Sequence, residues 1–379
     1  IDMITRKSLE ILENNLVISR NCNRQYDDSF AVQGAKIGST LRIRLPDRAL
    51  VTDGAALQVQ DDNEQYTTLT VASQKHIGIN FTSAELTMQL DDFAERVLKP
   101  RISQLASSID ADVANAYKSI YNSVGTPGTT PATSLVMLHA QQKLNEGATP
   151  MSPPYATVNP AANAGLVEGM KGLFNPTDTI SRQFRNGMMG TGVLGFDEVN
   201  MSESIGMHTA GEWGTTITST GTLSTQGQAT LPISFTGSSK TWKQGDVFTI
   251  AGVYAVNPQT RQSTGSLQQF VVTEDLTASS TGTLKISPAI YTASHALATV
   301  DSFPQANAVV TMLGSASSQY AQNLVYHKDA ITLATADLLM PQGVDMASRQ
   351  THNGISMRIV RQYDINNDRM PCRVDVLYG

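Results

Sequence analysis

The amino-acid sequence predicts an α+β fold with a second, β-rich domain inserted into the chain. Residues 100–121 carry apolar side chains at intervals of three and four, which is typical of a long amphipathic helix. Residues 355–363 and 372–378 are strand-like, and in the second run Cys372, Val374, Val376 and Tyr378 share one face by a period of two. From about residue 209 to 294 the chain becomes rich in Thr, Ser, Gly and Gln. Because the flanking segments lack this character, an insertion explains the pattern better than a tandem domain.

Composition and charge narrow the class of protein. The 379 residues are 40% hydrophobic and 16% charged, which describes an ordered chain long enough for two or three domains. The formal net charge of -6 indicates no basic surface that would bind the phosphates of nucleic acid. We therefore expect that the protein can lie near DNA without binding it tightly. Cys22 and Cys372 lie near opposite ends, which excludes a disulfide framework or CxxC metal site and indicates a reducing compartment. No apolar run reaches the roughly 20 residues of a membrane span, and residues 1–30 lack a signal peptide.

The N-terminal part is expected to form a helical arm and a long hairpin. Residues 6–18 place leucines at helical spacing, which predicts a short amphipathic arm. Residues 40–45 and 66–71 are strand-like and would pair with each other. The segment between them is too polar to fold back on a core of its own.

The charges on this hairpin are segregated along the chain. They are Arg42, Arg44 and Arg48 in the first half, and Asp61, Asp62 and Glu64 in the second. One explanation is an ordinary solvated surface, the default for exposed charges. The other is that the loop lies on a neighbouring subunit and pairs charges across the boundary, where complementarity sets register more than affinity. The charges alone leave both explanations open.

The middle of the chain supplies further elements. Leucines between residues 135 and 144 predict another helix, which should end near Gly147. The strand-like runs inside the Thr- and Ser-rich block are 247–253, 269–273 and 283–287. Trp213 and Trp242 both fall in this block, as a separate domain with its own core would require. Residues 305–324 return to a helix-like pattern.

A charged triplet, His327, Lys328 and Asp329, interrupts an otherwise apolar run. His, Lys and Asp can all transfer protons, so the triplet is a candidate for chemistry. Three consecutive side chains cannot converge on one point from a strand or a helix, however. The charges are therefore expected at the end of an element, at a domain boundary or subunit contact, because burying an unpaired charge is costly.

Other motifs give no better support for catalysis. Gly190, Gly192 and Gly195 match GxGxxG, but no buried strand precedes the motif and no helix opens after it, so a glycine-rich turn before a strand is the better interpretation. The six histidines are scattered without HxH or HExxH spacing. There is no nucleophile elbow and no Walker loop. We therefore expect no catalytic residues, no metal site and no cofactor.

Several segments together resemble the major coat protein of short-tailed phages of the P-twenty-two type. They are DDFAERVLKPRISQLASSIDADVANA, GFDEV before the insert, GDVFTIAGV within it, VYHKDAITLATADL after it and the closing CRVDVLYG. Their order and spacing are more specific than any one segment, and they extend over most of the chain.

The resemblance implies the Hong Kong 97 (Johnson) capsid fold, with an inserted β-barrel-like domain. The implied parts are an N-terminal arm (1–34), an extended E-loop (35–80), a peripheral domain with the spine helix (81–131), an axial domain (132–208), the insertion domain (209–322) and a return to the axial and peripheral domains (323–379).

The resemblance also implies a function and partners. The chain would be a non-catalytic major capsid protein that self-assembles, as hexamers and pentamers, into the icosahedral shell around the double-stranded DNA of a tailed bacteriophage. A scaffolding protein and a portal would assist, assembly would occur in the cytoplasm of the host bacterium, and the protein would reside in the virion. We expect neither membrane association nor sequence-specific DNA binding. The alternative is a β-rich adhesion or carbohydrate-binding protein.

Subunit contacts and chemical linkage can also be anticipated. The residues expected at subunit interfaces are Arg42, Arg44, Arg48, Asp61, Asp62, Glu64, His327, Lys328 and Asp329. Some shells with this fold join their subunits covalently through a lysine of the E-loop. Residues 41–72 contain no lysine, and Lys36 and Lys75 only flank this segment, so a shell without covalent cross-links is expected.

Overall fold

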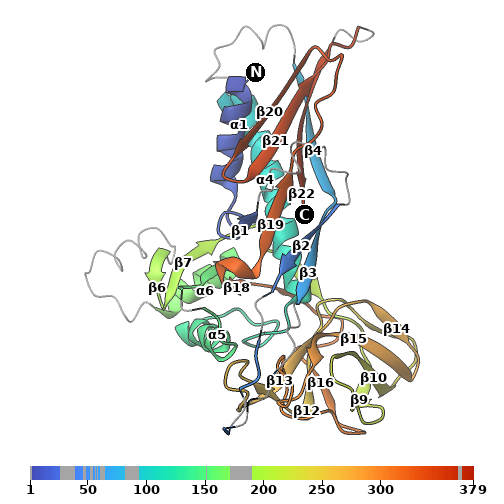
Figure 1. The fold of residues 1–379 in the computed structure, drawn as a ribbon. Coiled ribbons are helices and arrows are strands. Elements are labelled where there is room, and N and C mark those ends of the chain that lie inside the picture. Colours follow the sequence, from blue (N-terminus) through green and yellow to red (C-terminus); the bar gives the residue numbers. More distant parts are fainter. Residues whose placement is uncertain are drawn as a thin grey trace. The chain divides into compact units, whose positions relative to one another are not determined.

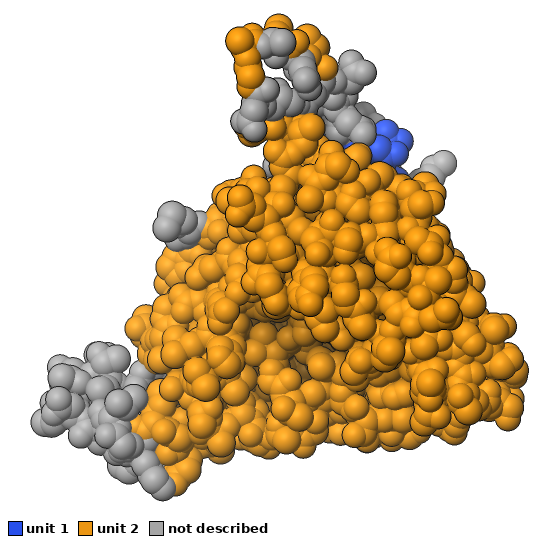
Figure 2. Space-filling view, turned by 90° about the horizontal axis from the view of Figure 1, so that it is seen from below, with its two compact units in different colours: residues 1–47, 63–113, 328–379 blue, residues 48–62, 114–327 orange. Residues whose placement is uncertain are grey.

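The computed structural model describes residues 2–25, 39–45, 48–51, 54–55, 57, 59, 65–81, 94–150, 152–170, 190–365 and 369–379. These residues fall into two compact units. The face shown in Figure 2 belongs almost entirely to unit 2, drawn in orange. Unit 1 comprises residues 1–47, 63–113 and 328–379, and unit 2 comprises residues 48–62 and 114–327. Both combine helices with sheet, as expected for an α+β chain (Figure 1).

The sheet of unit 1 is built around the last strand of the chain. Its strands, in spatial order, are β1 (Asn23–Gln25), β19 (Thr332–Ala336), β22 (Met370–Tyr378), β21 (Ile355–Arg361) and β20 (Met346–His352), with β4 (Ser73–Phe81) also paired to β22. The β22–β4 ladder is continuous and antiparallel, from Met370 opposite Phe81 to Tyr378 opposite Ser73. The strand-like runs near the C-terminus are therefore confirmed as β21 and β22, and β22 pairs with a segment about 300 residues earlier in the chain.

Two helical segments accompany this sheet (Figure 1). Helix α1 (Asp2–Asn15) is the predicted amphipathic arm, and it packs against β20 and β21. The predicted long helix begins as the π-helical segment η2 (Ala94–Leu98) and continues as α4 (Lys99–Ala114). It tightens into a 3-10 segment, η3 (Asn115–Ser119), before the predicted end at residue 121. The apolar stripe of α4 is buried, as its periodicity predicts.

Asp110 of α4 joins the N-terminal arm to the rest of unit 1. Its buried carboxylate accepts hydrogen bonds from the backbone N–H groups of Val17 at 2.6 Å, Ile18 at 3.3 Å and Ser19 at 3.0 Å. The Ser19 hydroxyl donates a further bond at 2.5 Å. Backbone donors at the end of the arm thus receive a charged acceptor, which is stronger than a neutral one.

A four-stranded sheet of unit 2 consists, in spatial order, of β18 (Leu324–Tyr326), β5 (Tyr155–Val158), β7 (Phe196–Met201) and β6 (Gly190–Val193). The predicted helix after residue 134 is α5 (Ser134–Glu146), and α6 (Pro160–Gly169) follows β5. A turn at Leu194 and Gly195, both with positive φ, joins β6 to β7. This glycine-rich segment forms a hairpin turn before a strand, as predicted, and no helix opens at it.

The Thr- and Ser-rich block forms a curled sheet with its own core. In spatial order its strands are β16 (Val310–Met312), β12 (Val247–Val256), β13 (Ser263–Val272), β15 (Thr281–Ile290), β10 (Gln228–Thr236) and β9 (Thr215–Ser219), and β11 (Lys240–Trp242) pairs separately with β14 (Leu276–Ala278). Trp242 is buried in the core, and Trp213 packs against it. A bridge between Thr218 and Val309 joins the two ends of the sheet, so the expected barrel is present in part.

The helix-like interpretation of residues 305–324 is wrong. The structure places β16 and β17 (Gln319–Ala321) there, and β18 begins at Leu324. β16 pairs with β12 of the inserted sheet, and β17 pairs with β8 (Met207–Thr209). Pairing with distant strands outweighs the helical period of the local sequence, and Gly314, at φ 94°, lies in the bend two residues after β16.

Replacing Asp110 by alanine should lower the free energy of unfolding by roughly 3–5 kcal/mol, because buried backbone N–H groups of the arm lose a charged acceptor. Denaturant unfolding of the unassembled subunit measures this. The control is Gln104→Ala on the exposed side of the same helix, for which we expect less than about 0.5 kcal/mol. Equal effects of the two substitutions would show that the Asp110 contacts do not stabilise the arm.

Candidate assembly surfaces

The predicted hairpin exists and carries little core of its own. β2 (Ser39–Arg44) and β3 (Tyr66–Val71) pair in register from Ser39 opposite Val71 to Arg44 opposite Tyr66. At its base, Val71 is buried against Ala334, Ala336 and Leu377. An isolated hairpin is marginally stable in water, so its outer part would be stabilised by contact with another surface.

The arginines expected at an interface lie on or beside this hairpin and are exposed. The Arg42 guanidinium stands 4.9 Å from the centre of the Tyr66 ring, a cation–π contact between opposite strands. Arg44 ends β2, and Arg48 follows the strand. Asp61, Asp62 and Glu64 lie outside the described residues, so charge pairing across a subunit boundary stays a prediction.

Apolar side chains between the two strands of the hairpin were missed by the analysis of charge. Leu57 and Val59 are 89% and 84% exposed, and Leu45 and Val51 are also exposed. Large apolar groups gathered on one exposed segment are typical of a contact surface. The signal was available in the sequence as the apolar residues of ALVTDGAALQV, in a segment expected to have no core.

The charged triplet lies where the chain passes from unit 2 to unit 1, between His327 and Lys328. His327 is buried and hydrogen-bonds through Nε2 to the hydroxyl of Ser152. Lys328 and Asp329 are exposed and begin the short 3-10 segment η5 (Lys328–Ala330). Asp329 accepts a hydrogen bond of 3.1 Å from the side chain of Asn23 in β1. The side chains of His327 and Asp329 bond to different parts of the chain, which is the divergence expected of neighbouring residues.

A buried polar cluster in unit 2 resembles part of a catalytic triad but serves the fold. His208 Nε2 lies 2.9 Å from Asp246 Oδ1, and His208 Nδ1 lies 3.2 Å from the hydroxyl of Tyr117. The other oxygen of Asp246 accepts the backbone N–H groups of Gly211 at 3.1 Å and Lys243 at 2.8 Å. These buried hydrogen bonds therefore connect the turn before β12 with β8 and with η3. Its members are too far apart in sequence for any motif to indicate it.

A second charged cluster was also missed, on the sheet of unit 1. Asp375 of β22 is fully buried, and Arg358 Nη2 of β21 and Arg373 Nε donate to it at 2.8 and 2.6 Å. Gln74 of β4 donates to Asp375 at 3.2 Å. Burial raises the pKa of the Asp375 carboxyl, but the bonds and charges of Arg358 and Arg373 outweigh it and hold that pKa below its usual value of 3.8.

The described residues contain neither a cluster of metal ligands nor a helix that could span a membrane. In that part of the chain, His, Cys, Asp and Glu form no group of three that could hold a metal ion. No helix among the same residues is long and apolar enough to cross a membrane.

Comparison with known proteins identifies a family. A family model described as "P22 coat protein - gene protein 5" matches residues 1–379. No curated protein matches the chain significantly.

Solved structures were also compared. A structure from Mycobacterium phage Che8 is 10% identical with a TM-score of 0.44, and the alignment covers 96% of this chain and 86% of that one. The mature capsid of bacteriophage PhiM1 is 11% identical with a TM-score of 0.42, at 96% and 82% coverage. A virus-like particle from Pyrococcus furiosus is 9% identical with a TM-score of 0.32, at 75% and 94% coverage. These scores are below 0.5, so the family match carries the assignment.

Substituting neighbouring residues of the charged triplet should have unequal effects. His327→Ala removes a buried side chain with its hydrogen bond to Ser152 and should lower the free energy of unfolding by roughly 1–3 kcal/mol. Lys328→Ala removes an exposed side chain and should change it by less than about 0.5 kcal/mol. Thermal or denaturant unfolding of the subunits measures both, and a larger loss for Lys328→Ala would contradict this account.

Asp375 should make the protein sensitive to acid. Because its pKa is lower folded than unfolded, its contribution to stability is fully present above the unfolded pKa near 3.8 and is lost as the pH falls toward the folded pKa. Asp375→Asn should lower the free energy of unfolding by roughly 3 kcal/mol at pH 7 and flatten its decline below about pH 4. Unfolding curves between pH 7 and 2.5 measure this. Asp345→Asn, at a partly exposed ion pair with Arg361, is the control and should cost less than about 1 kcal/mol.

Proposed function

The chain belongs to the P22 coat protein family, and we propose that it is the major capsid protein that self-assembles into the icosahedral shell of a tailed bacteriophage. The match of the family model to all 379 residues carries this proposal. The alternative, a β-rich adhesion or carbohydrate-binding protein, has no support from the family match.

The structure of the subunit supports assembly through many modest contacts. A closed shell requires one subunit to make similar contacts in hexamers and pentamers, so its stability is distributed over several interfaces. The hairpin of β2 and β3, with exposed arginines and the apolar residues Leu57 and Val59 between its strands, is the kind of surface that a neighbouring subunit would cover.

The finer assignments follow from family membership and belong to the same proposal. Residues 1–34, 35–80, 81–131, 132–208, 209–322 and 323–379 would be the N-terminal arm, E-loop, peripheral domain, axial domain, insertion domain and return segment. A scaffolding protein and a portal would take part in assembly within the host bacterium, and the shell would enclose double-stranded DNA. The net charge of -6 is consistent with a shell that does not adhere to the genome.

Purified protein should form closed shells or capsomers in electron micrographs, and the hairpin arginines should be needed for this. Replacing Arg42, Arg44 and Arg48 together by Gln should raise the protein concentration required for assembly by about tenfold or more, because contacts between subunits are lost. The free energy of unfolding of the subunit should change by less than about 1 kcal/mol. Lys285→Gln, at an exposed ion pair of the inserted sheet, is the control. Normal assembly of the triple variant would exclude the arginines from the interface.

The assembled shell should contain no covalent links between subunits. Shells dissolved in denaturant and run on a denaturing gel should give one band at the chain mass of 40.7 kDa. The physical reason is the absence of lysine between residues 41 and 72. A ladder of multiples of the chain mass would contradict this expectation.

A further inference from the structure

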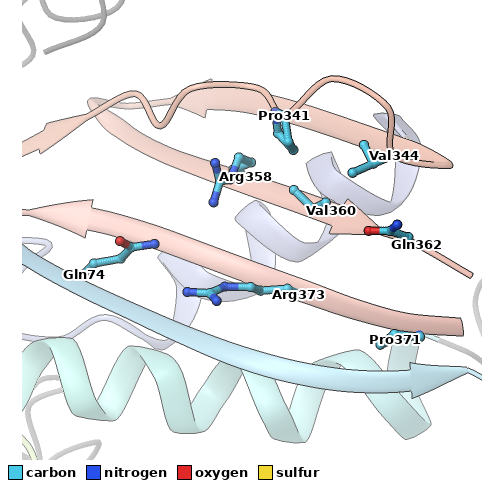
Figure 3. Close-up of a pocket in the computed structure, with 8 residues that line it drawn as sticks. All are labelled: Gln74, Pro341, Val344, Arg358, Val360, Gln362, Pro371 and Arg373. Atoms are coloured by element: carbon cyan, nitrogen blue, oxygen red, sulfur yellow. The ribbon is translucent and has the colours of Figure 1, made fainter. Parts of the chain in front are cut away.

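The sheet of unit 1 has one face turned to helices and one face that carries a groove. Along β22, Val374 and Val376 alternate with Arg373 and Asp375, so the two pairs point to opposite faces. Tyr378 shares the face of the valines, and its hydroxyl donates to Asp112 of α4 at 2.5 Å, which identifies the helix-covered side. The opposite face holds a groove of about 490 Å³ (Figure 3). Its lining residues are Gln74, Pro341, Val344, Arg358, Val360, Gln362, Pro371 and Arg373.

The charges in this groove do not balance. Arg358 lies directly opposite Asp375 in the β21–β22 register, and Arg373 lies two residues from Asp375 on the same face. Two guanidinium groups therefore share one carboxylate, which leaves the groove with a net charge of about +1. Asp375 is buried beneath them and is already engaged by both arginines and by Gln74.

Arg373 is the side chain that remains available to a ligand. It uses Nε to bond Asp375, and no further hydrogen bond of its guanidinium occurs within the described residues. Its side chain is 48% exposed, compared with 16% for Arg358, whose Nη1 donates to the carbonyl of Leu339. In Figure 3, the side chains of Arg373 and Gln74 extend toward each other. A planar guanidinium with free N–H groups matches the geometry of a carboxylate.

The apolar part of the lining specifies the ligand further. Pro341, Val344, Val360 and Pro371 surround the polar groups. Apolar walls exclude water and strengthen an ion pair formed between them. The site therefore suits a carboxylate carried on a chain with apolar neighbours, as in a protein segment, better than a small hydrated anion.

We propose that this groove is a contact site between subunits, in which Arg373 binds an acidic side chain of a second copy of the chain. This inference rests on the proposed function. The chain has 33 acidic and 27 basic residues, so copies repel each other overall and would approach where a positive site meets an acidic group. Among the described residues, Arg358 and Arg373 are the two arginines that share a single carboxylate. The groove is therefore a positive site that an acidic group of another copy could approach.

The first test compares the reactivity of arginines in free subunits and in shells assembled from purified protein without nucleic acid. Phenylglyoxal modification followed by mass spectrometry should label Arg373 in free subunits and much more slowly in shells. Arg369, exposed in the adjoining turn and outside the groove, is the internal reference. Equal labelling of Arg373 in shells and subunits would overturn the groove proposal while leaving the proposed function intact. If the wild-type protein forms no shells, the proposed function fails and the groove proposal fails with it.

The second test uses matched variants. Arg373→Gln should raise the concentration required for assembly by about tenfold or more, and Arg369→Gln by less than about twofold. Arg373→Lys keeps the positive charge but loses the forked pair of guanidinium N–H donors, so its effect on the concentration required for assembly should lie between those of the other two variants. Thermal unfolding of the subunits separates assembly from folding, because Arg358 still engages Asp375 in each variant. Normal assembly of Arg373→Gln would reject the site, and if that variant does not fold, the labelling of the wild-type protein decides.

Discussion

The ladder between β22 and β4 is the interaction on which unit 1 depends. It joins the last strand of the chain to the strand that directly follows the hairpin of β2 and β3. β21 and β19 pair along the other edge of β22, and α1 and α4 pack on the resulting sheet. The base of the hairpin is fixed by the same strand, because Val71 packs against Leu377. A slip of one residue in this ladder would exchange the valines of β22 for Arg373 and Asp375 on the helix-covered face, so burial enforces the register.

The inserted sheet is accommodated because its ends are brought together. β8 and β17 pair from Met207 opposite Ala321 to Thr209 opposite Gln319, so the chain enters and leaves the inserted sheet through neighbouring strands. An insertion whose two ends lie side by side costs little chain entropy, because the entropic cost of closing a loop rises only weakly with its length. Asp246 and His208 add buried hydrogen bonds at the same place. The insertion can therefore maintain its own core, centred on Trp242, without disturbing the strands on either side.

Features with a local cause could be predicted from the sequence. The stripe of α4, the alternation of β22 and the pairing of β2 with β3 each follow from a repeat of 3.6 or 2 within a short window. The segment 305–324 was misjudged because its strands exist through distant partners, with β16 paired to β12 and β17 to β8. The cluster of Gln74, Arg358 and Asp375 joins residues about 300 positions apart. Register across three strands creates that cluster, and no single window of sequence contains it.

The partners of the buried carboxylates determine which positive charges of this acidic, charge-poor chain remain available for contacts with other copies. Asp110 and Asp375 are each satisfied inside the subunit, the first by backbone N–H groups and the second by two arginines. Using backbone donors for Asp110 leaves cationic side chains free for other roles. Sharing Asp375 between Arg358 and Arg373 has the opposite consequence, since one positive charge remains at the surface of a sheet. In a chain whose copies repel each other, such a charge directs where copies meet more than how tightly they hold. Weak, directed contacts suit a closed shell, because each subunit contributes several of them and their sum provides the stability.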